Sequence, residues 1–166
     1  MSLLAQKELS RRSFIRLSVF GLITIFLGWR FFFRTKKYLI PNQKNLSSND
    51  AQILAAVYTA ITLEDSGPAI AEAISKIDQF ISTLTRRSRL ELKTALHLLE
   101  QSPLLFHGYI SRFTGLSLES RTKVLEGWQQ GSLWRRPVFN ALKELSYLAY
   151  YTDSGNWKKI GYNGPL

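Results

Sequence analysis

The sequence predicts an all-α protein: one amino-terminal signal-anchor helix, an irregular bundle of about five to six helices, and an aromatic, non-helical carboxyl-terminal tail. Three observations predict this class. An apolar run lies near the amino end, and apolar residues downstream recur at spacings of three and four, which is typical of amphipathic helices. No stretch alternates with period two over the length of a strand. The 166 residues include no cysteine, which excludes disulfides and thiolate metal sites.

The first segment, residues 1–37, begins with a basic motif. It reads Ser-Arg-Arg-Ser-Phe-Ile-Arg, the pattern of a bacterial twin-arginine export signal. The targeting residues are Ser10, Arg11, Arg12, Phe14, Ile15 and Arg16. We interpret the motif as an address for the twin-arginine translocase, which exports folded proteins. The alternative is that its arginines are only the positive flank of a membrane segment.

An apolar run follows the motif, from Leu17 to Phe33. Its seventeen residues reach the lower end of the roughly 17–25 residues that a spanning helix needs. No Ala-x-Ala-like cleavage site follows, so we expect an uncleaved signal anchor. Four positive residues precede the run, and four more follow its uncharged part, which ends at Trp29, with Arg30 near the end of the run; charge therefore does not decide its orientation. The motif then predicts a single pass through the bacterial inner membrane, with the body facing the periplasm.

The net charge of +10 belongs mainly to this first segment. Residues 1–37 hold eight Lys or Arg and one acid, whereas residues 38–166 hold fourteen bases and eleven acids. A nucleic-acid-binding domain is expected to carry a basic patch of its own. We interpret the basic clusters of the body, at 86–89 and 135–136, as solvated helix starts, so nucleic acid is not an expected partner.

The stretch 38–48 is predicted to be a linker, because it is rich in Asn and Ser and contains Pro41. The domain that follows, residues 49–166, opens with a helix whose N-cap is expected at Asn49, with Asp50 favourable in the first turn. An acidic turn with Gly and Pro, near residue 65, ends this helix. Its apolar stripe comprises Ile53, Leu54, Val57, Tyr58 and Ile61.

The second helix has the clearest pattern in the body. Its apolar residues recur at steps of four, three and four, which keeps one face buried. The stripe comprises Ile70, Ile74, Ile77, Phe80 or Ile81, and Leu84. The residues expected to face water are Glu72, Lys76, Asp78 and Gln79.

Four further helices complete the predicted bundle. Ser102-Pro103 is expected to break the third helix, and Pro103 to open a short fourth one. Ser117 is the expected N-cap of the fifth helix, which stops near Gly131. The sixth is expected to begin near Pro137. The ranges are 87–101, 103–113, about 118–131 and about 137–151.

No catalytic motif is visible in the sequence. It has no Gly-rich phosphate loop, no G-x-S-x-G elbow and no C-x-x-C-H haem attachment motif. The two histidines, His97 and His107, lie on either side of the predicted break, and zinc needs at least three protein ligands. We interpret His97 as a partly buried polar residue rather than a ligand. The expectation is therefore no catalytic residue, no metal and no cofactor.

The carboxyl-terminal tail is rich in Trp, Tyr and Gly. An aromatic segment of this kind packs on its own bundle or onto a partner, and the sequence leaves both open. Interface hot spots favour Trp and Tyr. The residues assigned to partner docking are Trp128, Trp157, Ile160, Gly161, Tyr162, Gly164 and Pro165.

Two stretches give the chain a family resemblance. Residues 113–128 read FTGLSLESRTKVLEGW, and residues 157–165 read WKKIGYNGP. With the twin-arginine start, they resemble the gluconate 2-dehydrogenase subunit 3 family. The resemblance implies an accessory subunit, whose partner is an FAD-containing catalytic subunit of the glucose–methanol–choline class, often with a cytochrome c subunit. It implies no catalytic residue in this chain.

The sequence thus leads to one expected function and one alternative. The expected function is a non-catalytic subunit that escorts, exports and anchors a flavin-dependent alcohol or sugar dehydrogenase. This chain departs from the family pattern because it lacks a cleavage site, which favours a membrane anchor over a soluble subunit. The alternative is a stand-alone membrane-anchored helical protein that has no dehydrogenase partner and whose tail only packs on its own bundle.

Overall fold

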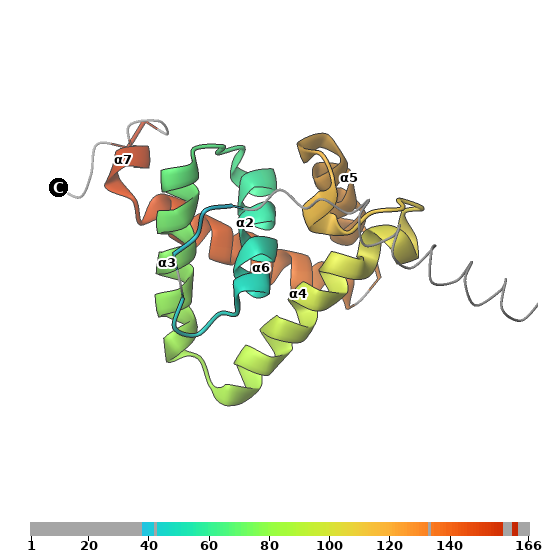
Figure 1. Ribbon diagram of the computed structural model, residues 1–166, viewed down its shortest axis with the longest axis horizontal. Coiled ribbons are helices and arrows are strands. Elements are labelled where there is room, and N and C mark those ends of the chain that lie inside the picture. The colour runs from blue at the N-terminus through green and yellow to red at the C-terminus, as the bar shows by residue number, and fades with distance from the viewer. Residues whose placement is uncertain (1–37, 42, 133, 158–160, 163–166) are drawn as a thin grey trace, which may run out of the picture. The chain divides into compact units, whose positions relative to one another are not determined.

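The computed structural model describes residues 38–41, 43–132, 134–157 and 161–162. Within these ranges the chain is all-helical, with no strand, which confirms the predicted class (Figure 1). The elements are α2 (Ser48–Thr62), α3 (Gly67–Thr83), α4 (Arg86–Phe106), the 3-10 turn η1 (Phe113–Gly115), α5 (Leu118–Gln129), α6 (Arg135–Tyr151) and α7 (Ser154–Trp157). The predicted export motif and apolar run lie outside the described residues. None of the helices that are described has the length and apolar character to cross a membrane.

The central helix of the body is α2, which contacts α3, α4, α5, α6 and η1. Four residues of its predicted apolar stripe are buried and the fifth, Ile61, is partly buried. Most of the opposite side is buried too. Alanines close that side, and a helix that is apolar all round belongs in a core. The buried alanines are Ala51, Ala55, Ala56 and Ala60. The N-cap is Ser47 rather than the predicted Asn49, because the Ser47 hydroxyl accepts the Asp50 backbone N–H at 3.2 Å.

The predicted stripe of α3 is confirmed, with Ile70, Ile74, Ile77 and Ile81 buried in the core. One residue was placed wrongly. Asp78, expected to face water, is only 4% exposed. Its carboxylate accepts backbone N–H groups from three consecutive residues, and such bonds compensate for the lost hydration of a buried charge. The donors are Lys44, Asn45 and Leu46, at 3.1, 2.9 and 2.8 Å.

The segment before α2 therefore lies against the body, although its backbone is irregular as predicted for a linker. Asp78 holds residues 44–46, and Gln52 of α2 holds Tyr38 at the other end of the segment. The Gln52 side chain accepts the Tyr38 N–H at 2.7 Å and donates to the Tyr38 carbonyl at 2.8 Å. The chain thus enters the body at a defined place.

The predicted break at Ser102-Pro103 is wrong, because α4 continues through Pro103 to Phe106. A proline inside a helix leaves the carbonyl four residues earlier without its amide donor. Here that carbonyl belongs to Leu99, and the Ser102 hydroxyl donates to it at 2.9 Å. The predicted fourth helix, residues 103–113, is correspondingly not formed: residues 103–106 belong to α4, and η1 is the only helical element described between α4 and α5.

The N-cap predicted for α5 is confirmed, since the Ser117 hydroxyl accepts the Ser120 N–H at 3.3 Å. The last long helix, α6, begins at Arg135, two residues before the predicted start. It packs against α2, α3 and α5. It contributes Phe139, Leu142 and Ala149 to the core.

A buried polar network holds η1 between α4 and α5. Arg121 is 3% exposed and donates to the carbonyls of Phe113 and Thr114, at 3.2 and 2.6 Å, and to the Tyr38 hydroxyl at 2.8 Å. Glu100 accepts the backbone N–H and the hydroxyl of Thr114, at 3.1 and 2.7 Å. Burial raises the pKa of Glu100, and the two bonds from Thr114 oppose that rise.

Candidate partner-docking site

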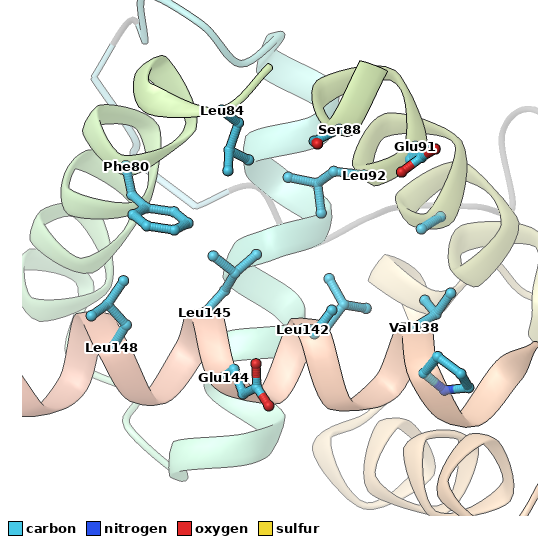
Figure 2. Close-up of a pocket in the computed structure, with 13 residues that line it drawn as sticks. Phe80, Leu84, Ser88, Glu91, Leu92, Val138, Leu142, Glu144, Leu145 and Leu148 are labelled. Atoms are coloured by element: carbon cyan, nitrogen blue, oxygen red, sulfur yellow. The ribbon is translucent and has the colours of Figure 1, made fainter. Parts of the chain in front are cut away.

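An apolar groove lies between the end of α3, the first half of α4, and α6 (Figure 2). Its volume is about 640 Å³, within the roughly 300–1,000 Å³ of ligand pockets. Its polar lining consists of one hydroxyl and two carboxylates, from Ser88, Glu91 and Glu144. Its large apolar side chains are Phe80, Leu84, Leu92, Leu142, Leu145 and Leu148.

The groove exists because α3 and α4 diverge from a short connection. Figure 1 shows the two helices meeting at one end and separating toward the other. Thr85 caps α4 by accepting the Ser88 N–H at 3.2 Å, so α4 starts three residues after α3 ends. Side chains of α3 and α4 that face the space between the two helices contact α6 at the bottom of that space, and the other side of the space stays open. In Figure 2, Phe80 projects into the groove from α3, and Leu148 projects toward it from α6.

Apolar surface remains open to solvent in this groove. Leu142, at its floor, is 1% exposed, whereas Phe80 and Leu148 at its edge are 39% and 42% exposed. An apolar, concave and open surface is typical of a binding site for a protein segment or an apolar ligand.

The charges around the groove are negative. Glu91 forms an exposed ion pair with Arg87 at 2.9 Å, and Glu144 forms no ion pair with any residue that the structure describes. Among the residues that the structure describes, no Lys or Arg lines the groove. Its electrostatics therefore favour a segment that carries Lys or Arg beside its apolar side chains.

The described residues of the carboxyl-terminal tail, 152–157 and 161–162, follow the end of α6. The predicted tail is not entirely non-helical, because α7 gives it one helical turn. The Trp157 indole N–H donates to the Tyr151 carbonyl at 2.7 Å, and its ring meets the Tyr162 ring edge to face at 5.4 Å. Gly161 adopts φ +74°, a left-handed backbone conformation that glycine adopts without steric cost. Tyr162 keeps 46% of its surface exposed.

The docking residues assigned from sequence separate into three groups. Trp157, Gly161 and Tyr162 come together in the tail. Trp128 is 0% exposed inside the body, so it offers no surface to a partner and its assignment does not agree with the structure. Its N–H donates to the Ser102 hydroxyl at 3.0 Å, which satisfies the buried indole. The other assigned docking residues, Ile160, Gly164 and Pro165, lie outside the described residues. The targeting residues lie outside them as well.

The two histidines have separate surroundings. Nε2 of His97 lies 3.3 Å from Oδ1 of Asp50, which is 1% exposed, and Lys93 approaches the other oxygen at 3.7 Å. Nδ1 of His107 faces the Ser102 carbonyl at 3.5 Å. The described residues contain no group of three or more His, Cys, Asp or Glu that is able to hold a metal ion. His97 is half exposed and lies beside a buried carboxylate.

The groove itself was not assigned from the sequence, although a signal for it was present. Phe80 and Ile81 are adjacent and both apolar, and one helix face accepts only one of them. Ile81 enters the core at 2% exposed, which leaves Phe80 toward the groove. In α6, Leu148 lies beside the core residue Ala149 in the same way. Adjacent apolar pairs on two helices therefore mark a second apolar surface.

Comparison with known proteins finds no match among family models, curated proteins or solved structures. The functional argument therefore starts from this chain's own residues and geometry.

Proposed function

We propose that this chain is a non-catalytic, membrane-anchored accessory subunit that escorts, exports and anchors a flavin-dependent alcohol or sugar dehydrogenase of the glucose–methanol–choline class. The observation that carries the proposal is the open apolar groove between α3, α4 and α6. The twin-arginine motif and the family resemblance of residues 113–165 support the same function.

The proposed occupant of the groove is an apolar segment of the catalytic subunit that carries at least one Lys or Arg. Helix-in-groove recognition places apolar side chains of one partner into a groove of the other. Phe80 and Leu148 offer the apolar walls, and Glu144 offers a carboxylate that forms no ion pair with the described residues. The exposed Tyr162 of the tail offers a further aromatic contact to the same partner.

A docking subunit allows one export signal to serve both this chain and a catalytic subunit that has no signal of its own. The twin-arginine translocase moves folded proteins, so a catalytic subunit without a signal crosses if it is bound before export. The resemblance places the FAD and the reacting groups in that partner. In the family that the chain resembles, a cytochrome c subunit often accompanies the flavoprotein. The uncleaved apolar run then keeps the complex at the membrane.

The proposal is tested by purifying the tagged full chain from membranes and measuring bound flavin by its absorbance. A flavoprotein should co-purify with the parent chain. Leu148→Glu places a charge in the groove and should abolish the flavin signal. Leu90→Glu is the matched control, because Leu90 is exposed on α4 outside the groove, and it should retain the flavin. If the parent chain brings no flavoprotein, the stand-alone alternative is correct.

Export is tested with Arg11→Lys/Arg12→Lys, which keeps the charge but removes the planar guanidinium groups. We expect the catalytic subunit to remain in the cytoplasm with this double variant. Export of the variant at the level of the parent would show that the arginines are only a positive flank.

A further inference from the structure

A second exposed apolar surface lies where α4 ends and α6 begins. Its apolar members are Leu105, Phe106, Ile110 and Trp134, which are 62%, 49%, 77% and 45% exposed. The rings of Phe106 and Trp134 contact each other at 6.2 Å between centroids. We call this surface, together with Arg112 and Arg135, the aromatic–arginine patch.

The patch carries positive charge that the described residues leave unpaired. The Arg135 guanidinium lies 5.1 Å from the centroid of the Phe106 ring, and its Nε is buried and has no hydrogen-bond acceptor within the described chain. Arg112 is exposed, and the nearby carboxylate of Glu100 is buried and already bonded to Thr114. Neither arginine forms an ion pair in the part of the chain that is described. Large apolar and aromatic side chains flanked by Arg are typical of surfaces that lie in a membrane interface.

A short stretch of chain connects the body to the proposed membrane anchor. Tyr38 lies five positions after Phe33, the end of the apolar run, and a chain of that length spans at most about 18 Å. Arg121 binds both the Tyr38 hydroxyl and the carbonyl of Phe113. Phe113 directly follows Arg112, so the patch belongs to the part of the body that the chain entry tethers.

We propose that the aromatic–arginine patch rests on the surface of the lipid bilayer. Phe106, Ile110 and Trp134 contact the boundary between headgroups and acyl chains, and Arg112 and Arg135 bind anionic phosphate groups there. This inference rests on the membrane anchor of the proposed function.

The contact leaves the groove free for the catalytic subunit. Leu92, in the groove, and Leu105, in the patch, are both on α4 and thirteen positions apart. A helix rises 1.5 Å per residue, so the two lie about 20 Å apart along the axis. One end of α4 then meets lipid while the other end is open to the partner.

The experiment uses the full chain in vesicles, without a partner protein. The absence of cysteine allows a single fluorophore to be attached through Ile110→Cys, or through Leu90→Cys as the control. Vesicles contain anionic phosphatidylglycerol and phosphatidylcholine, with nitroxide-labelled lipid as quencher. We expect most of the fluorescence to be lost at position 110 and little to be lost at position 90. Arg112→Ser/Arg135→Ser should restore much of the fluorescence at position 110, and so should replacing the anionic lipid with neutral lipid.

Three results would overturn the inference. A chain that floats with the vesicles but shows no quenching at position 110 retains its anchor and lacks the lipid contact. Spectral shielding at position 110 without lipid quenching means that protein, a second copy or another chain, covers the patch. A chain that does not float removes both the anchor and the patch proposal. Flavin co-purification reports separately on the docking function.

Discussion

Two tryptophans of similar predicted role occupy opposite environments. Trp128 on α5 is fully buried, bonded to Ser102 and packed edge to face against Trp134 at 5.6 Å. Trp157 in the tail is partly exposed, bonded to the Tyr151 carbonyl and packed against Tyr162. Both indole N–H groups are satisfied, so the difference lies in what surrounds the rings. The core encloses Trp128 with several helices, whereas a single turn of chain supports Trp157.

The difference shows that an aromatic residue is available to a partner only where its own fold does not enclose it. Trp128 stabilises the body and Trp157 shapes a surface. The partner-binding claim accordingly concerns the tail and the groove, and the stability of the body concerns α2 and the helices around it. Four substitutions test this division.

Trp128→Ala should cause the largest loss of stability. Removing a large buried aromatic side chain leaves a cavity and costs about 3–5 kcal/mol of unfolding free energy. It also leaves the buried Ser102 hydroxyl without the indole donor. Chemical denaturation measures the loss, and Trp128→Phe should lose less because it retains most of the volume. A change within about 0.5 kcal/mol for Trp128→Ala would show that this site is not core.

Glu100→Gln tests the polar part of the core through its pH dependence. Burial raises the pKa of Glu100 above its ordinary 4.5, so the folded chain holds the proton more tightly than the unfolded chain. Its contribution to the unfolding free energy is therefore complete below about pH 4.5 and is lost as the pH rises through the folded-state pKa. The variant should lack this decline. It should also lose about 1–3 kcal/mol, because one Thr114 donor is left without its acceptor.

The pH measurement compares denaturation of the variant and the parent across the acidic range. Glu126→Gln, at an exposed position of α5, should retain the decline of the parent. Parallel pH profiles for the parent and Glu100→Gln would contradict the assignment to Glu100.

Trp157→Ala should reduce global stability by less than about 1 kcal/mol, because the tail is a terminal unit that opens locally. The same change should weaken partner binding by about 2 kcal/mol or more, the loss typical of a hot spot, which is a rise in Kd of roughly 30-fold. Melting by circular dichroism and capture of the flavoprotein give the two values. A fall in stability like that of Trp128→Ala would place Trp157 in the core. Normal melting with full capture would remove it from both roles.

Gly161→Ala should have the smallest effect. Nothing lies within 4 Å of the added Cβ, so the only cost is the left-handed backbone at φ +74°, about 1–2 kcal/mol locally. The Tyr162 N–H, which donates to the Trp157 carbonyl at 2.9 Å, should then exchange faster with solvent. Gly67→Ala is the control, since its added Cβ also meets nothing and its φ is not positive. Equal exchange in the parent and Gly161→Ala would show that this turn does not depend on glycine.

Local patterns in the sequence were sufficient to predict much of the bundle. Spacings of three and four determined the buried face of α3, and Ser117 determined the start of α5, because both depend on residues within one or two turns. The predicted break at Pro103 was wrong because it, too, was based only on neighbouring residues. Its effect on the helix depends on whether another donor reaches the Leu99 carbonyl, and the Ser102 hydroxyl does so.

Contacts between distant residues were decided only by the tertiary structure. Asp78 is buried because residues 44–46 supply three N–H donors from more than thirty positions away. Trp128 is enclosed because α4 and the start of α6 pack over it. The groove is open because the directions of α3 and α4 diverge, and no local pattern specifies the angle between two helices. By itself, the sequence determined the helical class, several helix ends and the cysteine-free composition. Burial, exposure and the groove required the packing of segments that are far apart in the chain.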